Sequence, residues 1–400
     1  MVAPFTMDAA APVLFGDGRL AELPEALVTH AAPRPGAPVM VVADRALVDL
    51  GAVHRVAGLL AAAGHPTLVA DPVEGEPGTT MIDALAAAMI AERAGAVVAV
   101  GGGATIDAAK LAAFLAPRGH VALDYALGAR AMPGGGLPVV AVPSTAGTGA
   151  EVTRTAVASG PDAEKLWFWG DGLLPAVSIL DGELTSTLPA ALTAWTGMDA
   201  CTHALEAATS GRTTAPARAF GLHALTLIAR YLPRAVADGQ DREARGQVLW
   251  AAMLAGRAIE QCGTHLGHNI GHALGSLARV HHGHATALGL EAALPWLVAE
   301  CTREGAEDFA SAAAALGAER EAEALPGAFA RLMRAAGIPA ALPGAAASLD
   351  AGTIARTMRR PANAPMLASS PRPVADSDID DLAARVAALA PTPAAPRPAA

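Results

Sequence analysis

Histidines gather in the second half of the sequence, and their spacing is that of residues that share a helix face. Eight of the 12 histidines lie within residues 203–284, and six of these fall in its last twenty positions. Asp199 stands four residues before His203, and His268 stands four residues before His272. Side chains four residues apart in a helix lie on the same face. The pattern therefore predicts helices that present carboxylate and imidazole groups together.

One carboxylate with three imidazoles makes a mixed oxygen and nitrogen ligand set. Such a set suits Fe²⁺ or Zn²⁺ and leaves room for a substrate oxygen as a further ligand. The alternative for any single histidine is a hydrogen-bonded side chain in a protein core, but scattered core histidines would not concentrate in this way. The spacing leaves open which histidines bind, because the cluster also contains His265, His281, His282 and His284.

A glycine-rich turn is the clearest local motif of the first half. The segment Val97–Lys110 reads VVAVGGGATIDAAK, with Gly101, Gly102 and Gly103 in a row. Glycine lets the backbone approach a ligand closely, and the free N–H groups of a helix N-terminus favour a phosphate or pyrophosphate. Asp107 is expected in the first helical turn, where a carboxylate is favourable. The motif lacks the G-x-G-x-x-G spacing, and a tight turn without a ligand is the alternative.

A second polar loop follows the next apolar strand. Residues 143–153 read PSTAGTGAEVT, and small hydroxyl side chains beside glycines can hydrogen-bond phosphate, ribose or amide groups. Two such loops after parallel strands would line the crevice in which open α/β sheets bind ligands. Asp44 ends another apolar strand, where its carboxylate could accept a hydrogen bond from an adenosine ribose and repel a 2′-phosphate. An ordinary strand-end aspartate is the alternative.

The elements that must position these groups divide the chain into two halves. Apolar segments alternating with helical patterns predict a parallel sheet covered on both faces. From about Leu184 onward the sequence predicts helices alone. We expect an α/β nucleotide-binding domain (1–183), an all-helical metal-binding domain (184–390) and a disordered tail (391–400).

The predicted strands are Val39–Ala43, Thr67–Ala70, Ala96–Val100, Pro138–Val142 and Ala176–Leu180. The predicted helices are Met81–Glu92, Ala104–Leu115, Ala190–Thr209, Ala215–Ala237, Glu243–Gly275, Thr286–Arg303, further helices between Ala306 and Ala336, and Ser377–Leu389.

Length and composition agree with this division. A chain of 400 residues exceeds the usual size of one hydrophobic core. The net charge of −10, without any basic run, argues against nucleic acid as a partner. The three cysteines are odd in number and widely spaced, as in a reduced cytosolic protein. The sequence shows no signal-peptide pattern and no apolar run of about 18 residues, so we expect a soluble, cytoplasmic protein that does not span a membrane.

Taken together, these motifs resemble those of the iron-containing (group III) alcohol dehydrogenases. The resemblance covers almost the whole chain, and it implies the fold class shared with dehydroquinate synthase: an α/β domain with a parallel sheet, followed by an all-α domain. It also implies a homodimer or a larger homo-oligomer. The motifs that carry it, in the family's order, are VLFGDGRLAELPEAL, GGGATIDAAK, PSTAGTGAEVT, ILDGELTSTLP, TAWTGMDACTHALEA, GHNIGHALG, HHGHATA and SPRPVADSDIDDL.

Carried over by position, the resemblance implies four ligands for Fe²⁺ or Zn²⁺: Asp199, His203, His268 and His282. His272 matches a family histidine close to the nicotinamide and the metal. We expect it to be the catalytic residue, relaying a proton to solvent.

The resemblance also implies the residues that bind the cofactor. Asp44 matches a position associated with preference for NAD(H), which makes NADP(H) less expected. The other implied cofactor residues are Gly101, Gly102, Gly103, Asp107, Thr145, Thr148 and Lys165. The chain departs from commoner family members at four places near the cleft: Ala104, Gly75–Pro77 in place of Pro-Asn-Pro, Lys165–Gly172 with its three adjacent aromatics, and Ile259–Gly267.

The expected reaction is hydride transfer between a nicotinamide and a small alcohol or aldehyde, with the metal polarising the substrate oxygen. One alternative is reduction of an anionic carbonyl compound such as phosphonoacetaldehyde or maleylacetate, for which Arg257 or Arg279 could supply the positive group. A second is a lyase like dehydroquinate synthase, which should carry several cations around the metal. Residues 193–288 contain eight arginines, mostly at exposed helix positions, and no lysine. A third alternative, a non-catalytic binding protein, conflicts with the intact ligand set.

Overall fold

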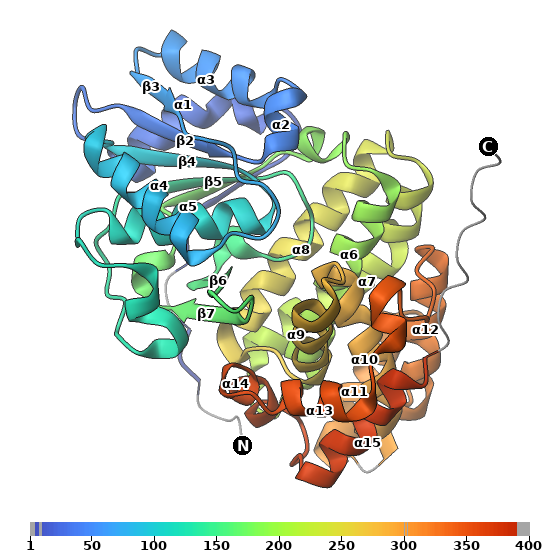
Figure 1. Cartoon of the computed structure of the whole chain (residues 1–400). Helices are drawn as coiled ribbons and strands as arrows, with labels where there is room; N and C mark the ends of the chain where they lie inside the picture. The colour runs from blue at the N-terminus through green and yellow to red at the C-terminus, as the bar shows by residue number, and fades with distance from the viewer. Residues whose placement is uncertain (1–4, 8–9, 300, 302, 390–400) are drawn as a thin grey trace, which may run out of the picture.

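A six-stranded parallel sheet organises the N-terminal half of the molecule. The computed structural model describes residues 5–7, 10–299, 301 and 303–389, so the predicted tail (391–400) lies outside the described residues. The strand order is β1-β8-β5-β4-β2-β3 (Figure 1). The strands are β1 (Val13–Phe15), β2 (Val39–Ala43), β3 (Thr67–Val69), β4 (Ala96–Gly101), β5 (Val139–Pro143) and β8 (Val177–Leu180).

Helices cover both faces of this sheet. In β4, Val97 and Ala99 contribute to one core while Val98 and Val100 contribute to the other. Strands buried on both faces read as continuous apolar runs, as predicted. The first core includes residues of α4 (Thr79–Ala91) and α5 (Gly103–Leu115), and the second includes residues of α1 (Leu23–Ala26) and α3 (Ala52–Ala62); α2 (Arg45–Asp49) follows β2.

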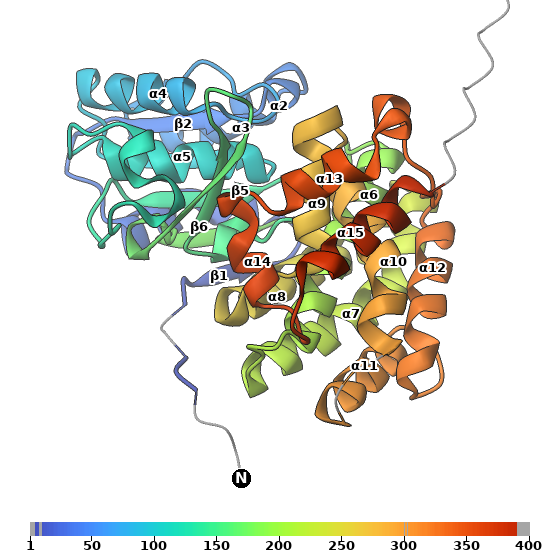
Figure 2. The same ribbon diagram turned by 60° about the horizontal axis from the view of Figure 1, so that its bottom comes forward.

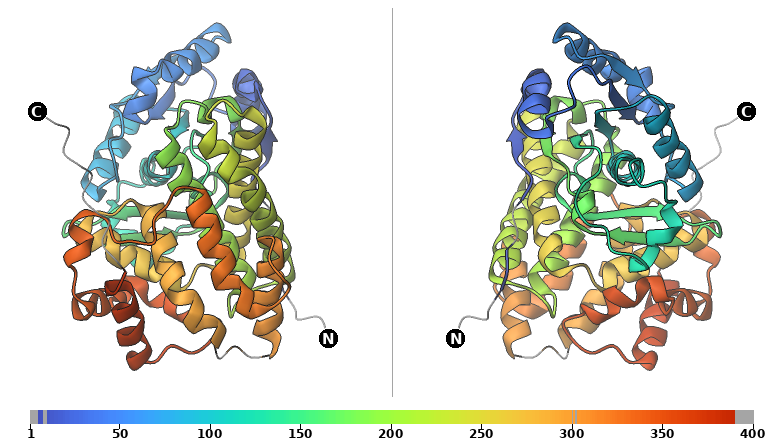
Figure 3. Two further views of the ribbon diagram at one scale, coloured as in Figure 1. Left: turned by 90° about the vertical axis from the view of Figure 1, so that its right-hand side faces the viewer. Right: turned by 90° about the vertical axis from the view of Figure 1, so that its left-hand side faces the viewer.

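An antiparallel hairpin stands apart from the sheet, and the sequence analysis missed it. It consists of β6 (Thr155–Ser159) and β7 (Lys165–Trp169). In Figure 3 the green hairpin lies between the blue and teal α/β layers and the orange and red C-terminal helices. The three adjacent aromatics Trp167, Phe168 and Trp169 form the end of β7, where Phe168 is buried and Trp169 is exposed.

The C-terminal half is entirely helical and has its own large core (Figure 2). The predicted fold class, a parallel α/β domain followed by a helical domain, is confirmed. In the described part of the chain, no helix is long and apolar enough to cross a membrane. The helices are α6 (Ala190–Thr209), α7 (Ala215–Ala237), α8 (Arg242–Cys262), α9 (Leu266–Ala278), α10 (His282–Ala299), α11 (Arg303–Ala315), α12 (Leu325–Ala335), α13 (Ala351–Met358), α14 (Ala364–Ala368) and α15 (Asp376–Ala387).

Two of the predicted helices had the wrong bounds, and one strand of the sheet was missed. The single predicted helix 243–275 is two helices, because α8 ends at Cys262 and Gly263 has a left-handed φ of 73°, a conformation that glycine favours after a helix end. The helix predicted from Thr286 begins at His282 instead. Strand β1 was not predicted, because three residues carry too little periodicity to identify a strand.

Candidate metal centre and nucleotide cleft

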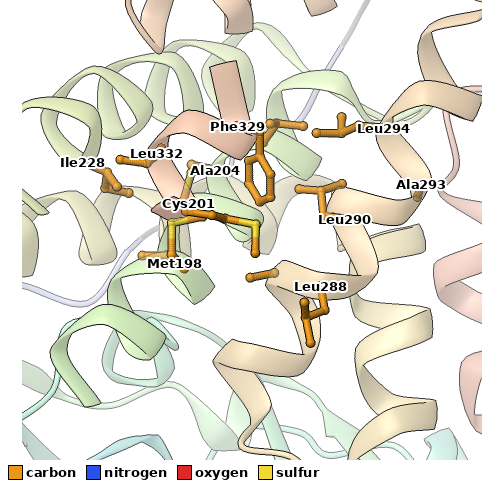
Figure 4. Close-up of a cluster of buried hydrophobic side chains, with 14 of the residues drawn as sticks. Met198, Cys201, Ala204, Ile228, Leu288, Leu290, Ala293, Leu294, Phe329 and Leu332 are labelled. Carbon is orange, nitrogen blue, oxygen red and sulfur yellow. The ribbon is translucent and has the colours of Figure 1, made fainter. Parts of the chain in front are cut away.

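Helix α6 presents a polar face and an apolar face. Asp199, His203 and Glu206 follow one another at intervals of four and three residues, so they share one side of the helix. All three are buried. Met198 and Cys201 belong to the apolar core of the helical domain, where Figure 4 shows them among leucine and phenylalanine side chains of other helices. Packing of the apolar face thus fixes the direction in which the carboxylate and imidazole groups point.

Helices α9 and α10 bring two more imidazoles to this face. Ligand atoms of Asp199, His268 and His282 all lie within 4.8 Å of one another. Nε2 of His268 is 3.8 Å from Oδ1 of Asp199, and Nε2 of His282 is 3.6 Å from the same oxygen. The ring of His203 stacks on that of His268 with 4.4 Å between centroids. The four sequence-predicted ligands therefore lie together.

Close helix packing makes this convergence feasible. A Cβ atom added to Gly283 of α10 would lie 2.1 Å from the carbonyl oxygen of Trp195 on α6. A Cβ atom added to Gly271 of α9 would lie 2.7 Å from the Thr286 side chain on α10. Glycine permits such backbone approach. As a result, the hydroxyl of Thr286 donates a 3.0 Å hydrogen bond to Oδ1 of Asp199 and holds the carboxylate in place.

Glu206 supports the centre, and the sequence analysis missed it. Its buried carboxylate accepts hydrogen bonds from the backbone N–H groups of His265 and Gly267, at 3.0 and 2.7 Å, at the start of α9. It also lies 2.6 Å from Nδ1 of His268. A carboxylate on one ring nitrogen orients the ring and leaves the other nitrogen free to bind a metal. Glu206 lies seven residues after Asp199, and this helical spacing was the available signal.

His268, His272 and His282 are held in the neutral form. Burial, reinforced by the neighbouring histidines, lowers the pKa of His268 to about 3 and that of His272 to about 3, and it places the pKa of His282 well below its usual range. Nε2 of His268 is buried and, among the described residues, has no hydrogen-bond partner. A neutral imidazole with an unpartnered nitrogen is the form that binds a metal, so the donor set fits Fe²⁺ or Zn²⁺.

The two predicted cofactor loops meet at the carboxyl edge of the sheet. A Cβ atom on Gly103 would lie 2.5 Å from the side chain of Thr148, and one on Gly102 would lie 3.4 Å from that of Thr145. The backbone N–H of Asp44 donates to the carbonyl of Val100, directly before the glycine turn. Asp44 caps α2 by accepting a hydrogen bond from the N–H of Ala46 at 2.9 Å.

The expectation that Asp107 lies in the first turn was wrong. Helix α5 begins at Gly103, so Asp107 is in the second turn and caps no N–H group of its own helix. Its carboxylate instead accepts a 3.0 Å hydrogen bond from the N–H of Val157 on β6. Burial raises its pKa to about 6, although Lys110, whose Nζ lies 3.6 Å away, lowers it. Asp107 therefore ties the glycine-rich turn to the hairpin.

Lys110 fixes the second loop and was also missed. Its buried ammonium donates to the carbonyl oxygens of Ala150, Thr153 and Thr155 at 2.8, 3.0 and 2.6 Å. These three bonds determine the path of the chain between the second loop and β6. The signal in the sequence was composition, because Lys110 and Lys165 are its only two lysines among 28 basic residues.

Comparisons with known proteins agree with this arrangement. A family model described as iron-containing alcohol dehydrogenase matches residues 10–182, and one described as Fe-containing alcohol dehydrogenase family, C-terminal, matches residues 193–386. The chain belongs to the iron-containing alcohol dehydrogenase family. It is therefore an oxidoreductase, and the resemblance inferred from the motifs is confirmed.

Several relatives illustrate the range of this family. Long-chain-alcohol dehydrogenase 1 of Geobacillus thermodenitrificans is 34% identical over 273 residues, which are 68% of this chain and 69% of the relative. NAD-dependent methanol dehydrogenase of Bacillus methanolicus is 35% identical over 245 residues, which are 61% of this chain and 64% of the relative. The solved structure of sulfoacetaldehyde reductase from Bifidobacterium kashiwanohense in complex with NAD⁺ has a TM-score of 0.86 and 27% identity, covering 96% of this chain and 99% of that one.

In this member of the iron-containing alcohol dehydrogenase family, the hairpin reaches the C-terminal helices. The indole N–H of Trp167 donates a 3.1 Å hydrogen bond to the carbonyl of Ala362. The side chain of the next residue, Asn363, lies close enough to His272 to oppose the lowering of the pKa of that imidazole. The ring of His272 lies 5.5 Å from that of His282 and 6.4 Å from that of His268, measured between centroids. The predicted catalytic histidine thus lies beside the predicted ligands, next to a contact between the two domains.

Proposed function

We propose that this chain is a metal-dependent, NAD-linked alcohol dehydrogenase that acts on a small alcohol or aldehyde. The observation that carries the proposal is the convergence of the buried Asp199 and His268 with the partly exposed His282 within 4.8 Å, together with the unpartnered Nε2 of His268. An orphaned buried nitrogen has a free-energy cost unless a ligand satisfies it. A divalent metal is the ligand that this set of side chains fits.

We assign the metal to Asp199, His203, His268 and His282, and we favour Fe²⁺ because the family models are described as iron-containing. Zn²⁺ accepts the same donors. Glu206 and Thr286 hold two of these ligands in position through hydrogen bonds. We assign no role to His281 and His284 in binding, because their rings face Trp195, at 4.9 and 5.8 Å between centroids.

We assign the nucleotide to the cleft formed by Gly101–Gly103, Asp107, Thr145, Thr148 and Lys165. Asp44, at the same edge of the sheet, favours NAD(H) over NADP(H), because a carboxylate accepts hydrogen bonds from a ribose and repels a 2′-phosphate. The buried hydroxyl of Thr105 in the first turn of α5 has no hydrogen-bond partner among the described residues, which supports a ligand at this turn. The NAD in the names of two relatives supports the same assignment.

When bound, the metal supplies a Lewis acid and the nicotinamide supplies or accepts the hydride. The chain itself orients the two reactants, since α6 carries His203 against the second loop, where its Nδ1 lies 3.4 Å from the carbonyl oxygen of Gly147. We assign His272 to proton relay, because it lies between the ligand histidines and the Ala362–Asn363 contact and is partly exposed. A homodimer or larger homo-oligomer is part of the proposal on the strength of the family alone.

Reduction of an anionic aldehyde is a second candidate function. The observation in its favour is the high structural similarity to sulfoacetaldehyde reductase, whose substrate carries a sulfonate.

The test is cofactor oxidation by metal-stripped protein reconstituted separately with Fe²⁺ and Zn²⁺. NADH and NADPH would each be supplied with a set of short aldehydes. We expect consumption of NADH that depends on the metal. The proposal fails if protein with stoichiometric bound metal and bound NAD reduces none of the aldehydes.

A further inference from the structure

Lys165 is the lysine that lies beside the candidate metal centre. It begins β7, and its Cε atom is 3.7 Å from the position that a Cβ atom on Gly275 of α9 would occupy. Gly275 follows His272 by three residues and so lies on the same side of α9. Only 13% of the Lys165 side chain is exposed. Besides contacting the nucleotide, as assigned above, an ammonium group in this place would attract the negative end of an anionic substrate.

Glu76 counters that charge. Its carboxylate forms an ion pair with the ammonium of Lys165. The backbone fixes this pairing, because the N–H of Ser159 donates to the carbonyl of Pro77 at 2.9 Å and Ser159 lies opposite Lys165 in the hairpin. The loop after β3 and the start of β7 are therefore held side by side. This backbone contact keeps the side chains of Glu76 and Lys165 within reach of each other.

Among the described residues, three arginines considered as further sources of positive charge lie beside a carboxylate or are exposed to solvent. Arg154, just after the second loop, pairs with Glu260 at 2.6 Å and with Asp171 at 3.0 Å. Arg257, one of the two arginines considered for an anionic substrate, lies close enough to Glu260 for that carboxylate to oppose the pKa-lowering effect of burial. The other, Arg279, is exposed at the end of α9. The cleft therefore offers little uncompensated positive charge.

We propose that Glu76 determines whether the enzyme prefers charged or uncharged substrates. By neutralising Lys165, it favours an uncharged alcohol or aldehyde and disfavours substrates with a carboxylate, sulfonate or phosphonate group. This inference rests on the proposed function, narrows its substrate class to uncharged compounds, and argues against the second candidate, reduction of an anionic aldehyde. Two opposite charges at contact distance cancel most of the field that a third charge would feel a few ångströms away. Loss of the carboxylate should restore that field.

The test compares an aldehyde with its charged counterpart in wild type and Glu76→Gln. 4-Oxobutanoate and methyl 4-oxobutanoate differ little except in charge, so the ratio of their kcat/KM values reports charge selectivity. Glu74→Gln is the matched control, because Glu74 lies two residues away in the same loop and pairs with Arg45 instead, at 2.9 Å. We expect wild type to favour the ester, Glu76→Gln to move the ratio about tenfold toward the anion, and Glu74→Gln to leave it within about twofold.

A binding measurement separates this inference from the proposed function. Calorimetry on metal-loaded enzyme without a nicotinamide would compare the affinities for 4-hydroxybutyrate and 1,4-butanediol in wild type and Glu76→Gln. Any direct contact between the carboxylate of the ligand and the metal is the same in both variants, so it does not alter the difference between them. If no aldehyde is reduced, the proposed function fails. The ratio of the affinities for 4-hydroxybutyrate and 1,4-butanediol then still shows whether Glu76 controls the preference for charge. The inference is overturned if wild type prefers the anion, or if Glu76→Gln leaves the ratio unchanged. In a Lys165→Met background, the effect of Glu76→Gln should vanish.

Discussion

The candidate metal centre and the candidate nucleotide site are assembled in different ways. The centre takes its side chains from the faces of three helices, and the groups on each helix are local in sequence: Asp199 with His203, and His268 with His272. The cleft takes its shape from loops and a hairpin joined by long-range hydrogen bonds, such as those of Asp107 and Lys110. The difference teaches that helical periodicity reveals a site built on helix faces, whereas a site built on loops becomes visible only through contacts.

The largest expected effect tests whether helix geometry selects the ligand. His281 and His282 are adjacent, but only His282 belongs to α10 and faces Asp199. We expect His282→Gln to lower metal affinity by about a hundredfold or more, since even partners of ligands are worth that much. His281→Gln, the matched control, should retain the metal. Metal content after dialysis measures both, and equal loss in the two variants would contradict the assignment.

Removal of Lys110 should damage the cleft and spare the centre. Lys110→Met leaves three carbonyl groups and two buried carboxylates, Asp107 and Glu151, without their cation. We expect the free energy of unfolding to fall by about 3 kcal/mol and NADH affinity to fall with it, while metal affinity stays unchanged. Arg118→Met, a more exposed cation near the end of α5, should cost about 1 kcal/mol or less.

Denaturant titration, fluorescence titration with NADH and metal content would separate these effects. An unchanged NADH affinity in folded Lys110→Met would show that the loops do not depend on this side chain.

The next prediction concerns Glu206, the supporting residue that the sequence analysis missed. We expect Glu206→Gln to weaken metal binding by about tenfold to a hundredfold, because an amide cannot replace a carboxylate that takes three N–H groups at once. Competition with a chelator measures the affinity. Glu243→Gln, at an exposed carboxylate paired with Arg234, is the control. If the two variants bind metal equally well, Glu206 has only a structural role.

The smallest expected effect concerns the contact between the domains. Trp167→Phe removes one hydrogen bond to Ala362 and should lower the free energy of unfolding by about 1 kcal/mol. The KM for the substrate should change and metal content should not, because Ala362 precedes the Asn363 that contacts His272. Trp169→Phe on the exposed side of the same strand should change stability by less than about 0.5 kcal/mol. A KM identical in both variants would show that the contact between Trp167 and Ala362 does not affect substrate binding.

The sequence predicted five of the six strands of the central sheet, because parallel strands buried on both faces read as unbroken apolar runs. It failed at Gly263, where one glycine in an otherwise helical pattern marks the end of α8. It also failed at the β6–β7 hairpin, since five-residue strands bounded by polar turns look like loops and their pairing is set by distant partners such as Asp107. Within the site, the sequence HHGH at residues 281–284 did not show which histidine binds the metal. Helix α10 begins at His282, and this explains why the ring of His282 faces Asp199.

The central claim is that a divalent metal lies among Asp199, His203, His268 and His282. The most direct measurement is anomalous diffraction, at the iron and zinc absorption edges, from crystals of protein reconstituted with each metal. We predict one strong peak bounded by these four side chains, within about 2.0 to 2.2 Å of their nitrogen and oxygen atoms. A peak beside His281 and His284 instead, or no peak in protein that reduces aldehydes, would contradict the account.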